Sequence, residues 1–104
     1  MAKPRSVKAT LKAARAVIAD KKRWTKEYFA VDMNGRPCEE NCLDAVKFCA
    51  LGALQFVDGP FECEAEDLLF NACERLFDLG VADTNDIKGH AAILKAFDRA
   101  IKDA

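Results

Sequence analysis

Residues 41–57, NCLDAVKFCALGALQFV, form the most continuous apolar stretch of the chain, and the predicted fold depends on them. From position 45 to position 57 only Lys47 and Gln55 are strongly polar. A helix that is apolar around nearly its whole circumference belongs in the middle of a bundle. The stretch is also shorter than the roughly 20 apolar residues that span a bilayer. We therefore predict a buried central helix, with Asn41 as its N-cap residue.

Small residues line one side of this predicted helix. Ala45, Cys49, Gly52 and Ala53 recur at helical spacing. A glycine inside a helix costs about 1 kcal/mol relative to alanine, so a close contact is expected to compensate at Gly52. The stripe predicts that another helix approaches closely at this side.

The remaining patterns predict three further helices and a β-hairpin. Apolar residues at helical spacing indicate helices over residues 6–22, 62–79 and 90–102. Asn34-Gly35 is a strong hairpin signal, and it predicts a hairpin over residues 28–38 in which Pro37 keeps the returning strand short. Gly80 is expected to end the helix over 62–79, and residues 81–89 are expected to form a loop.

These elements predict a mainly α fold. We expect a compact four-helix domain around the buried central helix, with the small β-hairpin between the first and second helices. A chain of 104 residues fits one domain, here residues 1–104.

The charges are distributed unevenly along the chain. Residues 1–26 contain nine Lys or Arg and one Asp, whereas residues 27–104 contain seven basic and sixteen acidic residues, for a net charge of −1 overall. The basic residues of the first helix form a stripe beside its apolar face, namely Arg5, Lys8, Lys12, Arg15 and Lys22. Three interpretations remain open for this stripe: a solvated face, or one partly neutralised by the protein's own acidic helix; a contact surface for an acidic partner protein; or a nucleic-acid contact.

Five cysteines, an odd number, occur in a chain whose N-terminus shows no signal-peptide pattern. This combination predicts reduced thiols and a cytoplasmic location. Cys49 lies within the apolar stretch, and Cys73 lies on the predicted core face of the third helix. Both are expected to be small core residues with unreactive thiols.

Cys38 and Cys42 lie close to the start of the predicted central helix, where helix dipoles favour a thiolate. With Cys63 or His90 they would supply zinc ligands, but the C-x3-C spacing lacks the second pair typical of structural zinc sites. A thiol or zinc protein is therefore kept as an alternative, and no metal or cofactor is expected. His90, the only histidine, is expected at the surface near a helix start.

Several short motifs in the middle of the chain resemble a family of small bacterial and bacteriophage proteins, catalogued as a domain of unknown function. The family pattern is Trp-Thr/Ser, then A-x-D-x-x-G-R, then D-A-V-x-W-C-x-x-G-A-L, and later Asn-Asp. Here it stands as Trp24-Thr25, Ala30, Asp32, Gly35-Arg36, Asp44-Ala45-Val46, Cys49, Gly52-Ala53-Leu54 and Asn85-Asp86. Phe48 replaces the family's usual Trp, and the Arg-Thr that usually follows Asn-Asp is missing. The resemblance implies a compact helical domain and no particular activity.

The sequence contains no Walker loop, dinucleotide-binding glycine turn, HExxH or nucleophile elbow. We therefore expect a small non-catalytic protein–protein interaction module, such as a phage or mobile-element accessory protein that modulates a host factor. The alternatives are a nucleic-acid-binding protein that uses the basic N-terminal helix, and the thiol or zinc protein that uses Cys38 and Cys42. No membrane partner is expected, and the oligomeric state stays open.

Overall fold

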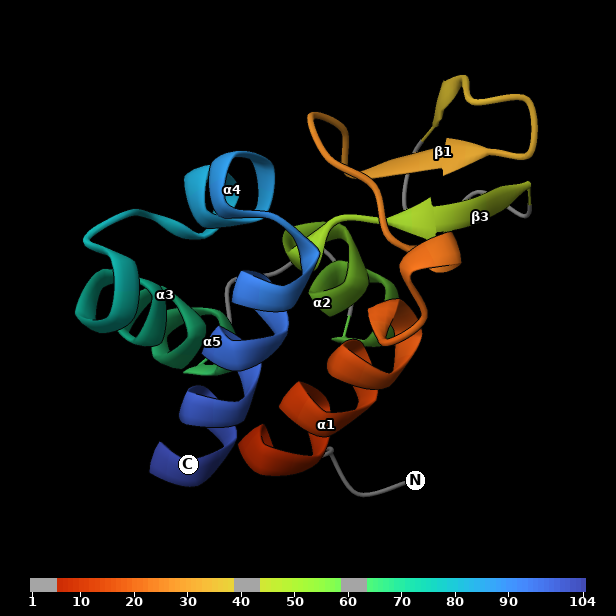
Figure 1. Ribbon diagram of the computed structural model, residues 1–104. Coiled ribbons are helices and arrows are strands. Elements are labelled where there is room, and N and C mark those ends of the chain that lie inside the picture. The colour runs from red at the N-terminus through yellow and green to blue at the C-terminus, as the bar shows by residue number, and fades with distance from the viewer. Residues whose placement is uncertain (1–5, 39–43, 59–63) are drawn as a thin grey trace.

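The computed structural model describes residues 6–38, 44–58 and 64–104. These residues form a mainly helical globule with five α-helices and a small antiparallel sheet of three strands between α1 and α2 (Figure 1). The elements in order are α1 (Val7–Ile18), η1 (Lys21–Arg23), β1 (Ala30–Asp32), β2 (Pro37–Cys38), β3 (Ala45–Phe48), α2 (Ala50–Asp58), α3 (Glu64–Phe77), α4 (Val81–Asp83), η2 (Thr84–Lys88) and α5 (His90–Asp103). Here η1 is a single 3₁₀ turn and η2 a π-helical turn.

The first helix begins and packs as its sequence predicts, but it ends earlier. The side chain of Ser6 accepts a hydrogen bond from the backbone N–H of Ala9 and caps α1. The apolar stripe faces the core, with Leu11, Ala14 and Ile18 fully buried. The sequence predicts one helix over residues 6–22, whereas α1 ends at Ile18. The Asp20 carboxylate then accepts from the N–H of Lys22 and caps η1.

The predicted hairpin is present, and its turn is held by one side chain. β1 pairs with β2 in antiparallel register, with Ala30 opposite Cys38. Asp32 Oδ1 accepts from the backbone N–H groups of Asn34 and Arg36, both at 2.9 Å. Gly35 adopts φ +79°, a left-handed conformation that glycine tolerates best. Asp32 and Gly35 together therefore explain why the chain reverses here.

The prediction of one central helix over residues 41–57 is wrong in its first half, where the chain forms a strand. Residues 45–48 form β3, which pairs with the other edge of β1 and makes β1 the middle strand. The helix α2 begins only at Ala50, and the predicted N-cap Asn41 lies outside the described residues. The core assignment still holds, since Phe48, Cys49 and Leu54 are all buried. α2 is not enclosed on all sides, because Phe56 is about half exposed.

The close contact expected at Gly52 exists, but its partner is a peptide group rather than a helix. A Cβ atom at this position would lie 1.9 Å from the carbonyl oxygen of Phe29. The same carbonyl accepts a hydrogen bond from the N–H of Cys49 at 3.1 Å. The absence of a side chain at Gly52 thus allows the segment before β1 to lie directly against the first turn of α2.

In the C-terminal part, two predicted features are wrong: the residue that ends the third helix and the loop over residues 81–89. α3 ends at Phe77, and the left-handed residue after it is Asp78 (φ +57°), whereas Gly80 has φ −71° and precedes α4. The predicted loop over 81–89 is mostly helical, formed by α4 and η2, and ends at Gly89 with φ +94°. α5 matches its prediction within one residue and buries Ile93 and Phe97.

The core lies where α1, α2, α3 and α5 pack together, with the sheet at one end of α1 and α2 and with α4 above α3 and α5 (Figure 1). The rings of Phe48 and Phe56 meet edge to face with their centres 4.8 Å apart, which links β3 to α2. None of the described helices is both long and apolar enough to cross a membrane.

Candidate functional site

A buried asparagine connects three segments that are far apart in the chain. Asn85 Oδ1 accepts from the indole N–H of Trp24 at 2.8 Å and from the backbone N–H of Ala50 at 3.1 Å. Its Nδ2 donates to the carbonyl of Thr25 at 3.1 Å. We call Asn85 with Trp24, Thr25 and Ala50 the Asn85 network. It joins η2 to the residues after η1 and to the N-terminus of α2. The N–H group of Ala50, the first residue of α2, has no acceptor within its own helix, and Asn85 supplies one.

The neighbouring carboxylate extends this network to the surface. Asp86 Oδ1 accepts from Asn85 Nδ2 at 2.9 Å and from the backbone N–H of Glu27 at 3.0 Å. Glu27 has φ +75°, an uncommon backbone conformation for a residue with a side chain. The bond to Asp86 helps to hold this conformation. Strained backbone of this kind often occurs at functional sites.

His90 is part of the same structural junction. Its Nε2 lies 2.6 Å from the carbonyl oxygen of Ile18, so Nε2 must bear the proton that is donated. Its ring also lies against that of Trp24, with centres 5.4 Å apart. His90 is half-buried at the start of α5 and joins that helix to the end of α1.

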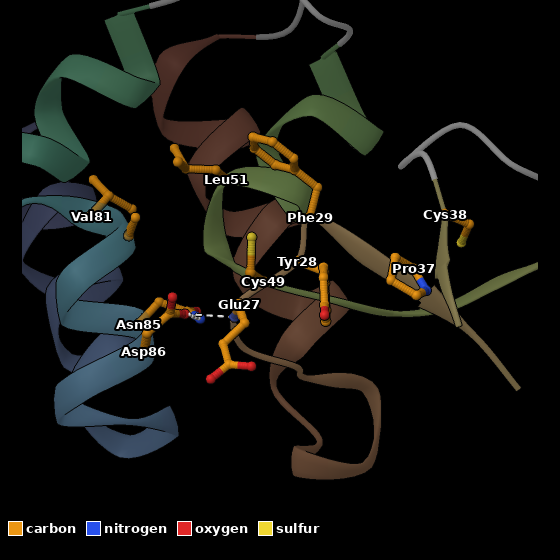
Figure 2. Close-up of a pocket in the computed structure, with 11 residues that line it drawn as sticks. Glu27, Tyr28, Phe29, Pro37, Cys38, Cys49, Leu51, Val81, Asn85 and Asp86 are labelled. Carbon is orange, nitrogen blue, oxygen red and sulfur yellow. Dashed lines mark hydrogen bonds between the residues drawn. The ribbon is translucent and has the colours of Figure 1, made fainter. Parts of the chain in front are cut away.

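A pocket of about 480 Å³ opens beside the Asn85 network, between the chain before β1, the strand β2, the start of α2 and α4–η2. Figure 2 shows Leu51, Phe29 and Val81 on one side of it and Glu27 and Asp86 on the other. No pattern in the sequence predicted this pocket, because its walls come from four separate segments. The adjacent Asn85-Asp86 pair was the signal that could have indicated it.

The Cys49 thiol lies in the pocket wall and caps α2. Its Sγ accepts from the N–H of Gly52 at 3.3 Å, and its carbonyl accepts from Ala53. Burial raises the pKa of Cys49, and hydrogen bonds from backbone N–H groups oppose this only partly. Burial likewise raises the pKa of Cys73. Both thiols are therefore protonated at neutral pH, as predicted for core cysteines.

The residues of the predicted basic stripe have different surroundings. Lys8, Lys12 and Lys22 are exposed, whereas Arg5 lies outside the described residues. Arg15 pairs with Asp98 of α5, with Nε 2.7 Å from Oδ1. The stripe is thus partly neutralised at Arg15 by the protein's own carboxylate, while the lysines project into solvent.

Two of the four residues proposed as zinc ligands, Cys38 and His90, lie within the described residues. Cys38 lies half-buried on β2, while Cys42 and Cys63 lie outside the described residues. Within the described part of the chain, no group of three or more His, Cys, Asp or Glu side chains could hold a metal ion.

A family model matches residues 2–103, nearly the whole chain, and its description is a family of unknown function, DUF6197. The chain belongs to this family. Neither the curated proteins nor the solved structures include a match to the chain. Membership in DUF6197 agrees with the resemblance to a domain of unknown function, and it assigns no activity.

The motif residues noted in the sequence have structural roles that the contacts explain. Trp24-Thr25 and Asn85 form the network, Asp32 and Gly35 form the turn, and Gly52 admits the Phe29 carbonyl. These residues therefore help to determine how the sheet, α2 and η2 fit together.

Proposed function

We propose that the protein is a small cytoplasmic interaction module that acts by protein–protein contact, without catalysis, and that it binds an acidic surface of its partner. The observation that supports this most directly is the set of exposed basic side chains on α1 and η1, namely Lys8, Lys12, Lys21, Lys22 and Arg23. A phage or mobile-element accessory role, in which the module modulates a host factor, is part of the same proposal.

Few carboxylates neutralise this basic face. Within the described residues the ion pairs are Arg15–Asp98 and Arg99–Asp103, and neither includes an exposed cation of the face. Asp20, the carboxylate within the segment, accepts from the backbone of Lys22. A positively charged surface of this kind accelerates association with a negatively charged partner and disfavours binding of positively charged proteins.

Nucleic acid is the second candidate, because the same lysines would also suit phosphates. The excess of acidic residues in the rest of the chain disfavours it, since those charges repel a polyanion at longer range.

The test is affinity capture from cells of the source organism, with and without nuclease, followed by binding measurements on the captured protein. A Lys8→Glu/Lys12→Glu variant should weaken that binding by about ten-fold. A Lys95→Glu/Lys102→Glu variant, with the same charge change on exposed positions of α5, should bind like the wild type. Equal binding by both variants would exclude the basic face, and capture abolished by nuclease would favour nucleic acid.

A further inference from the structure

The pocket beside the Asn85 network has the properties of a small-molecule site. Its volume of about 480 Å³ lies within the range of ligand pockets, which are typically about 300–1,000 Å³ and largely apolar. Leu51, Val81 and Phe29 supply apolar surface, and Tyr28 and Phe29 are each about half exposed at its edge. These aromatic rings are available to a ligand without any rearrangement of the core.

The charged groups of the pocket all have one sign. Among the described residues that line it, the charged ones are Glu27 and Asp86, and Lys and Arg are absent from this set. Within the described residues, both hydrogen bonds that Asp86 accepts use Oδ1, which leaves its other oxygen for a donor from a ligand. Two carboxylates beside an apolar wall attract a cation and disfavour an anion.

The Asp86 carboxylate and the Glu27 backbone are held in place before any ligand binds. Asp86 is fixed by Asn85, and the Glu27 backbone is fixed by Asp86 in its left-handed conformation. Figure 2 shows the Tyr28 side chain beside Glu27. An aromatic ring next to carboxylates is the combination that recognises organic ammonium groups. A hard metal ion would require more oxygen ligands than this apolar pocket presents.

From these observations we propose that the pocket binds a small organic cation, with its apolar body against Leu51 and Phe29 and its ammonium group between Glu27, Asp86 and Tyr28. This site shares no residue with the basic face, so it is independent of the proposed protein contact. The neutral Cys49 thiol lies between the two ends and offers a polarisable surface to an aromatic ring.

The test is titration of ¹⁵N-labelled protein with benzyltrimethylammonium, followed by amide chemical shifts. A probe this small should bind with a dissociation constant on the order of millimolar. Saturable shifts should appear around Glu27, Leu51 and Asp86 and be absent from the C-terminal half of α5. Benzyl alcohol should bind more weakly than the cation, and benzoate more weakly still.

Two charge-neutralising variants locate the cation, and a third serves as their matched control. Glu27→Gln and Asp86→Asn should each weaken binding by roughly ten-fold. Both keep the side-chain shape, and Asp86→Asn keeps an oxygen that can accept from Glu27. Asp83→Asn removes an exposed carboxylate of α4 that does not line the pocket and should leave the affinity unchanged.

The proposal is overturned if the cation gives no saturable shifts in the pocket, or if benzyl alcohol binds as tightly as the cation. It is also overturned if Asp83→Asn weakens binding as much as the two pocket variants do. A failed capture experiment on the basic face would leave this result unaffected, so the two proposals are tested separately.

Discussion

At the scale of single residues, Gly52 has the strictest steric requirement of the glycines in the described part of the chain. A Cβ there would lie 1.9 Å from the carbonyl oxygen of Phe29. Moving the backbone of Gly52 would disturb α2, and moving that of Phe29 would disturb β1. We expect Gly52→Ala to lower the free energy of unfolding by about 1–3 kcal/mol, although alanine is the better helix former. Chemical denaturation measures this change.

Gly80→Ala is the matched control for this substitution. Gly80 has φ −71°. The atom nearest to a Cβ added at this position would be a side-chain atom of Phe70, at 3.7 Å. The substitution should change stability by less than about 1 kcal/mol and is expected to be slightly stabilising. A Gly52→Ala protein as stable as Gly80→Ala would contradict the close contact with Phe29.

The two buried thiols predict a pH dependence of stability. Cys49 and Cys73 have raised pKa values in the folded protein, so between the unfolded and folded values the unfolded chain binds fewer protons. The stability contributed by the protonated thiols is therefore complete at neutral pH and decreases as the pH rises above about 9. Cys73→Ala should reduce this alkaline decrease, measured as denaturation midpoints from pH 7 to 10.5. An identical alkaline slope in wild type and variant would contradict the raised pKa of Cys73.

At the scale of elements, residues 45–57 show what the sequence could and could not predict. Their apolar character correctly placed Phe48, Cys49 and Leu54 in the core. The spacing of the apolar residues alone could not distinguish a short strand followed by a helix from one longer helix. The difference depends on β1, whose second edge needs a partner, and that pairing joins residues distant in the chain.

The pocket and the Asn85 network likewise depend on contacts between residues that are distant in the chain. Asn and Asp in residues 81–89 are common in loops, so their composition favoured a loop. Contacts with Trp24, Thr25 and Ala50, each more than thirty residues away in the chain, give Asn85 its role and bury the first part of the π-helical turn. By contrast, local signals such as Ser6 before α1 and Asn34-Gly35 in the hairpin predicted their structures correctly.

Loss of the Asn85 side chain should destabilise the protein more than most polar substitutions. Asn85→Ala leaves the Trp24 indole and the Ala50 N–H without their acceptor in a buried position, which should cost about 2–4 kcal/mol. Asn71→Ala, at an exposed position of α3, is the control and should cost less than about 0.5 kcal/mol. Denaturant titrations of both variants measure the difference, and equal stabilities would mean that Asn85 is not structurally important.

At the scale of the whole molecule, the basic face and the core are separate features. Lys8 and Lys12 are exposed on α1, beside the face whose residues pack into the core. Their reversal to Glu should therefore change the free energy of unfolding by no more than about 0.5 kcal/mol. Thermal denaturation of the double variant checks this, and a large loss of stability would show that these lysines contribute to the fold.

The single Trp side chain reports most directly whether Asn85 joins the segments together, because its indole N–H donates to Asn85. In a ¹H–¹⁵N spectrum of the wild type, the Trp24 indole N–H should exchange slowly with solvent deuterium, since it donates to Asn85 Oδ1 at 2.8 Å in a partly buried position. In Asn85→Ala it should exchange much faster, whereas in Asn71→Ala it should stay protected. Rapid exchange of this proton in the folded wild type would contradict the central role of Asn85.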